Sequence, residues 1–155
     1  MFSFMDLPDE QDVCSTVIPG VLYISGHVSA NDKDLMKDLM IKRIVRLGDH
    51  DDFNIYATHE DIEYHDIRIE DSLKSHFTRE ILDPALEFIR EAGGPVLVHC
   101  RADTSRSASV VITYLMVYNK ISFRESRLLL KSKRESISPN STFIKDLQKI
   151  YSTDV

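Results

Sequence analysis

The stretch that decides the fold is VLVHCRADTSRS, residues 96–107. Its first three residues are apolar and follow Gly93-Gly94-Pro95, as expected for a short central strand that is buried on both faces of a sheet. A polar loop follows, and from Arg106 apolar residues recur at helical spacing as far as Tyr118. The stretch therefore predicts a strand over 95–98, a loop, and a largely buried helix that begins at Arg106.

The loop between this strand and this helix is suited to bind a phosphate dianion. A loop that closes on a helix N-terminus directs backbone N–H groups at one point, and the helix macrodipole adds positive potential there. Five residues separate Cys100 from Arg106. That is enough chain to curl around a tetrahedral anion and to return a guanidinium, whose planar fork binds two oxygens at once. The same field favours the thiolate of Cys100, which is the nucleophilic form of a thiol.

Strands and helices alternate on both sides of this stretch. Asp83-Pro84 fits an N-cap followed by proline at the first helical position, which starts that helix at Pro84 and leaves 77–82 as a separate turn. The remaining patterns predict strands at 21–25, 41–47 and 63–69, a polar loop over 48–61, and helices at 30–40, 84–92, 122–133 and 140–151. The order predicts an α/β fold with a central, mostly parallel twisted sheet of about four to five strands, helices on both faces and a helical C-terminal third.

Composition narrows the class of protein. A chain of 155 residues fits one domain, and a net charge of -6 argues against a nucleic-acid binder or an anionic-membrane binder. The two cysteines, Cys14 and Cys100, are too few for a disulfide framework, and no Cys/His spacing is that of a metal site. No apolar run is long enough to span a bilayer, and the N-terminus is acidic where a secretory signal is basic. We therefore expect a cytoplasmic protein, which could also be nuclear, with reduced thiols and no cofactor.

His99-Cys100, five residues and then Arg106-Ser107 resemble the signature of the cysteine-dependent protein tyrosine phosphatase superfamily, and VLVHC, SRSAS and YLM resemble its dual-specificity branch. Further matches fall in the order that such domains use, at IPGVLYI (18–24), EDS (70–72), FI (88–89) and SPNSTF (138–143). The resemblance implies an arm over 1–15 and a catalytic domain over 16–155. It also implies that the chain hydrolyses phosphotyrosine and phosphoserine or phosphothreonine in proteins, through a cysteinyl-phosphate intermediate and without a metal.

The resemblance assigns roles to individual residues. Cys100 is the nucleophile and Arg106 the phosphate clamp, while Arg101, Ala102, Asp103, Thr104 and Ser105 form the phosphate-binding loop. A general acid must protonate the departing oxygen. Asp71 is the candidate, because it follows a predicted strand 29 residues before Cys100, which is where phosphatases of this resemblance carry their acid. Its competitors are Glu70 and Asp66.

Three supporting residues each carry two interpretations. Ser107 either caps the helix or, by resemblance, steadies the thiolate as a leaving group, and both roles are compatible. His99 is a core histidine that bonds to the backbone, and by resemblance it orients the loop and lowers the pKa of the cysteine. Asn140 is a helix cap that by resemblance also braces the phosphate loop.

The sequence departs from the family pattern at Asp103, where relatives usually carry glycine. Aspartate tolerates left-handed backbone, so the loop can still close. A carboxylate facing the phosphate would weaken binding, whereas one turned outward could pair with Arg101 or another base. We expect an active enzyme of reduced affinity, in which Asp103→Gly lowers KM. Two other functions stay open, namely a non-catalytic phosphoprotein-binding pseudophosphatase and a phosphatase of a phosphoinositide or an RNA 5′-triphosphate.

Two regions outside the site are unassigned. Lys120, Arg124, Arg127, Lys131, Lys133 and Arg134 form a local basic cluster that is either a solvated helix face or a docking surface. The arm either folds over the domain, pairs with another copy or stays disordered, and the protein is a monomer or a homodimer.

Overall fold

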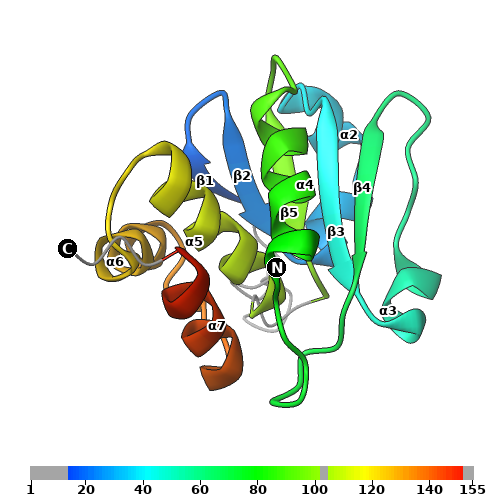
Figure 1. Cartoon of the computed structure of the whole chain (residues 1–155). Coiled ribbons are helices and arrows are strands. Elements are labelled where there is room, and N and C mark those ends of the chain that lie inside the picture. The colour runs from blue at the N-terminus through cyan, green and yellow to red at the C-terminus, as the bar shows by residue number, and fades with distance from the viewer. Residues whose placement is uncertain (1–13, 102–104, 152–155) are drawn as a thin grey trace, which may run out of the picture.

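The computed structural model describes residues 14–101 and 105–151. These parts of the chain form a five-stranded sheet in the order β1-β2-β5-β3-β4, in which β1 is antiparallel to β2 and the other neighbours are parallel (Figure 1). The strands are β1 Ser15–Ile18, β2 Leu22–Ser25, β3 Arg43–Gly48, β4 Glu63–Arg68 and β5 Val96–His99. The helices are α1 His27–Asn31, α2 Lys33–Asp38, α3 His50–Ile55, α4 Arg79–Arg90, α5 Arg106–Tyr118, α6 Phe123–Lys133 and α7 Ser141–Tyr151. The predicted α/β class and the helical C-terminal third are confirmed.

Side chains alternate along each strand, so a strand of apolar residues presents them on both faces of the sheet. Both faces are therefore packed against helices. On the central strand β5, Val96 and Val98 lie in the larger core with residues of α4, α5, α6 and α7. Leu97 faces the other way and packs in a smaller core with Met36 of α2. The strand is fully buried, which explains why Val96, Leu97 and Val98 are all apolar. The loop that follows it therefore starts at the edge of the sheet.

Two predictions before β3 were wrong. Residues 15–18 form the strand β1, whereas the arm was predicted to end at residue 15 and the first strand to begin at residue 21. The helix expected over 30–40 is divided into α1 and α2 by Asp32, whose backbone is extended and whose side chain accepts a hydrogen bond from the Leu35 N–H. An aspartate in this conformation caps a new helix better than it continues an old one.

Two boundaries after β3 also differ. The loop predicted over 48–61 contains α3, which begins with a capping box formed by Asp49 and Asp52. Helix α4 begins at Arg79 rather than at Pro84, so Pro84 lies inside it. Its N-cap is Thr78, and buried Phe77 and Leu82 occupy the two positions of a hydrophobic staple. Burial of this apolar face outweighs the hydrogen bond that a proline cannot donate.

Candidate active site

Cys100 lies at the exit of β5, and Ser107 lies in the first turn of α5. The cysteine is fully buried, and its Sγ is 3.2 Å from Ser107 Oγ. The N-cap of α5 is Ser105, so the hydroxyl of Ser107 does not cap this helix. The geometry therefore matches the second interpretation of Ser107, a hydroxyl beside the cysteine sulfur.

Arg106 is buried at the N-terminus of α5, with 4% of its surface exposed. Its Nη1 donates to Asp52 Oδ2 at 2.8 Å and to the Ile69 carbonyl at 3.1 Å. Its Nε is buried and has no hydrogen-bond partner among the residues that the structure describes. A buried guanidinium N–H is costly to leave unpaired, so this edge of Arg106 is placed for an anionic ligand.

Asp52 is the main residue that sequence reasoning missed. Its carboxylate accepts hydrogen bonds from Arg106 and from the Asp49 N–H, and it lies 3.4 Å from Arg101 Nη1. Burial would raise the pKa of Asp52, but these hydrogen bonds and the charge of Arg106 outweigh burial and lower it. Gly48 permits this placement, because a Cβ there would meet the Asp52 Cβ at 2.7 Å. The spacing Asp49-x-x-Asp52 is that of a capping box, and it could have indicated from the sequence that a helix begins here.

The charges around Cys100 are coupled. Burial would lower the pKa of Arg106, but the negative charges of Cys100 and Asp52 raise it overall. The pKa of Tyr56 is raised well above its usual range by burial and then by the charge of Cys100. Arg106 and Tyr56 therefore both respond to a charge on the cysteine sulfur.

Two histidines hold the start of the phosphate loop. His99 Nδ1 donates to the Cys100 carbonyl at 3.1 Å, and burial lowers the pKa of this histidine to about 4, so it is neutral near pH 7. Its ring and the ring of Tyr56 pack in a T-shaped arrangement, with their centroids 4.6 Å apart. The Arg101 carbonyl accepts the backbone N–H of His27 at 2.8 Å and its Nδ1 at 2.9 Å. His27 is a second residue that the sequence analysis did not single out.

Asn140 joins the phosphate loop to the candidate general acid. Its Oδ1 accepts the Phe143 N–H as the cap of α7, and its backbone N–H donates to Ser105 Oγ at 3.0 Å. Its Nδ2 donates to Asp71 Oδ1 at 2.9 Å. Both interpretations of Asn140 therefore correspond to contacts in the structure, and Asp71 is placed beside the loop by the same side chain.

The remaining predicted site residues are placed as follows. Glu70 is exposed, and exposed Asp66 forms an ion pair with Arg46 on the edge of the sheet. Arg101 is also exposed and faces Asp52. Ala102, Asp103 and Thr104 lie outside the described residues, so the predictions for them stay predictions.

Two searches concern only residues 14–101 and 105–151. They contain no helix with the length and apolar character needed to cross a membrane. They also contain no group of three or more His, Cys, Asp or Glu side chains arranged to hold a metal ion.

Residues 22–153 match the family model described as "Dual specificity phosphatase, catalytic domain". The "MAP kinase phosphatase with leucine-rich repeats protein 3" of Dictyostelium discoideum is 37% identical over 143 residues, which cover 87% of this chain and 16% of that protein. "Dual specificity protein phosphatase 18" of Homo sapiens is 33% identical over 129 residues, which cover 81% of this chain and 66% of that protein. The chain thus spans only part of the curated relatives that it matches.

Solved structures share the fold. The human "tyrosine phosphatase-like serine/threonine/tyrosine-interacting protein" has a TM-score of 0.79 at 27% identity, with 88% of this chain and 93% of that chain covered. The structure titled "DUSP15" has a TM-score of 0.79 at 26% identity, with 90% of this chain and 88% of that chain covered.

Proposed function

The chain belongs to the dual specificity phosphatase family, and from this we propose that it is a cysteine-dependent phosphatase of phosphorylated proteins. We assign the catalytic domain to residues 16–155. The observation that carries the proposal is the buried guanidinium of Arg106, which Asp52 holds by one edge while its Nε has no partner among the described residues. A phosphate oxygen is the acceptor that this N–H lacks.

In the first step, Cys100 Sγ attacks the phosphorus and the bond to the leaving oxygen breaks. The nucleophile attacks as a thiolate, and the electron pair of the broken bond leaves with the oxygen, which Asp71 protonates. Arg106 follows the equatorial oxygens into the transition state, where the developing charge makes its hydrogen bonds most valuable. The product alcohol departs, and the phosphoryl group remains on Cys100.

In the second step, water attacks the phosphocysteine and Asp71, now a carboxylate, takes a proton from it. The sulfur leaves as a thiolate, and the hydroxyl of Ser107, at 3.2 Å, donates to it. Inorganic phosphate and the starting enzyme result. We propose the cytoplasm as the compartment of this chemistry, because a thiolate nucleophile needs reducing surroundings to escape oxidation.

Dual specificity toward phosphotyrosine and phosphoserine or phosphothreonine is part of the proposal. A highly anionic non-protein substrate is disfavoured, because the extra base of the loop, Arg101, lies 3.4 Å from the Asp52 carboxylate and is partly neutralised by it. Phosphopeptides are therefore the substrates to assay first.

The experiment that tests the proposal is hydrolysis of an aryl phosphate and of matched phosphotyrosine and phosphothreonine peptides, with chelator present. We expect turnover by the wild type and by Cys14→Ser, and none by Cys100→Ser. A wild type that binds phosphopeptide without turnover would instead support the second candidate, a phosphoprotein-binding module. One structural relative is named "tyrosine phosphatase-like", which favours including this candidate.

A further inference from the structure

The outer face of α6 carries an uncovered basic and apolar surface, which we call the α6 groove. It is a hollow of about 500 Å³ lined by Phe123, Arg124, Arg127, Leu128, Lys131 and Gln148. Leu128 is 58% exposed, and the three bases have no carboxylate beside them in this lining, as far as the structure describes the chain. A large exposed leucine among like charges suits an occupant that is both acidic and apolar.

Three members of the basic cluster predicted from the sequence, Lys120, Lys133 and Arg134, do not line this surface. Arg134 is the C-cap residue of α6 and is 1% exposed. Its Nη1 donates to Ser15 Oγ at 3.1 Å, and its charge lowers the pKa of Cys14, although burial dominates and raises that pKa overall to about 11. Arg134 therefore fixes the first described residues of the chain at the C-terminal end of α6, where α6 lies beside β1 (Figure 1).

Residues 1–13 continue from this point, and their sequence complements the α6 groove. They read MFSFMDLPDEQDV, with four acidic residues and no lysine or arginine. The acidic residues begin at Asp6 and run toward the attachment point, whereas most of the apolar ones are farther away. An extended segment of this length reaches roughly 43 Å, and a helix of the length of α6 spans only about 16 Å. The segment is thus long enough to run back along the whole helix.

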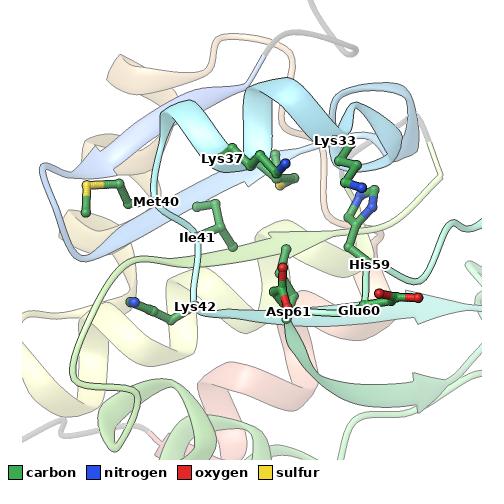
Figure 2. A pocket seen from close by; sticks show the side chains of 10 residues that line it. Lys33, Lys37, Met40, Ile41, Lys42, His59, Glu60 and Asp61 are labelled. Atoms are coloured by element: carbon green, nitrogen blue, oxygen red, sulfur yellow. The ribbon is translucent and has the colours of Figure 1, made fainter.

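A second hollow with lysines on its rim competes for the same segment. It measures about 290 Å³ and lies between α2 and the residues before β4 (Figure 2). Lys33, Lys37 and Lys42 line it, but Glu60 and Asp61 line it too. Because these carboxylates offset most of the positive charge, this hollow attracts an acidic segment less than the α6 groove does.

We propose that residues 1–13 bind in cis along the outer face of α6. Their carboxylates lie against Arg124, Arg127 and Lys131, and their apolar side chains cover Leu128. This binding explains how the chain tolerates a large exposed leucine in a basic surface, and it is independent of catalysis at Cys100.

Paramagnetic relaxation in the full-length chain tests the proposal. A nitroxide is attached at Ser3→Cys in a chain that also carries Cys14→Ser and Cys100→Ser, and amide line broadening is measured by ¹⁵N NMR. We expect the amides of 124–131 to lose most of their intensity and those of β4 to keep theirs. Broadening centred on α2, or no localised broadening, overturns the proposal.

Charge reversal supplies the matched comparison. Arg127→Glu with Lys131→Glu should abolish the broadening on α6, and adding Asp9→Lys with Glu10→Lys should restore it. Lys33→Glu with Lys37→Glu is the control on α2 and should leave the broadening unchanged. Broadening of α6 that survives reversal at Arg127 and Lys131 contradicts the assigned contacts.

A mixing experiment separates binding in cis from binding to a second copy. Nitroxide-labelled chain without ¹⁵N is mixed with ¹⁵N chain without nitroxide. The proposal requires that α6 of the ¹⁵N chain stay sharp in the mixture, and broadening there refutes binding in cis.

Discussion

Replacing Asp52 with asparagine is expected to lower the free energy of unfolding by about 2–3 kcal/mol at pH 7. The carboxylate and the guanidinium of Arg106 are each 5% exposed and 2.8 Å apart at their nearest atoms. Unit charges about 4 Å apart attract by about 4 kcal/mol at an effective dielectric constant of 20. Asparagine keeps one acceptor and avoids the burial of a charge, so the loss of stability is smaller than the full attraction. Arg106 also keeps its hydrogen bond to the Ile69 carbonyl.

The pH dependence of the same variant gives a second test. Because the folded-state pKa of Asp52 lies below its ordinary value, its contribution to stability is complete above about pH 4 and is lost as the pH falls further. Urea unfolding of the two proteins should therefore converge in acid. Asp51→Asn is the control, since this neighbouring carboxylate is exposed and should cost about 0.5 kcal/mol or less. A difference at Asp52 under 0.5 kcal/mol at pH 7, or one that persists unchanged at pH 3, would refute this account of the pair.

Four further outcomes are expected. Asp71→Asn should lower kcat/KM, which reports the first step alone, by roughly 10²–10⁴ for aryl phosphates with poor leaving groups and by less for activated ones, and an equal loss for all would contradict a general acid. Ser107→Ala should slow phosphoenzyme hydrolysis about 10- to 100-fold, seen as a burst of phenol in rapid-quench kinetics, and no burst would count against its role. Because the pKa of His99 is near 4 in the folded protein, the unfolding free energy should fall as the pH decreases from about 6.5 to 4, by up to ~1.4 kcal/mol per pH unit. His99→Gln should remove this slope in urea titrations. Pro84→Ala should raise the unfolding free energy by about 1 kcal/mol, because α4 then regains a backbone donor, and a destabilised variant would show that Pro84 is needed in place.

The parts of the fold that were predictable are those in which local pattern and tertiary role agree. The strand β5 and the helix α5 were correct because a central strand is apolar throughout and a buried helix repeats at 3.6 residues. Pro84 misled the prediction of α4, since a proline is common at the first helical position but is tolerated later when the apolar face packs well. The strand β1 is short and lies at the edge of the sheet, so its pairing with β2, rather than its own sequence, defines it.

The candidate site divides in the same way. Cys100, Arg106 and Ser107 lie within one strand, loop and helix, so their proximity follows from the local sequence. Asp52 is 54 residues from Arg106, and only the sheet order brings them together. The parallel pairing of β3 with β5 places Arg46 opposite His99, so β3 continues to Gly48 alongside the exit of β5. The chain then turns into α3 and delivers Asp52 to the N-terminus of α5.

This carboxylate changes the argument about Arg106. A cation at a helix N-terminus opposes the macrodipole and is favourable there only beside an anion, which Asp52 supplies. The group of Arg106 that still lacks an acceptor is the Nε–H, which is buried and without a partner among the described residues. Because Asp52 bonds to Nη1 and fixes the guanidinium from that side, a phosphate that binds at Nε displaces no contact between the two side chains. Under the proposed function, Asp52 therefore orients Arg106 for the phosphate instead of competing with it.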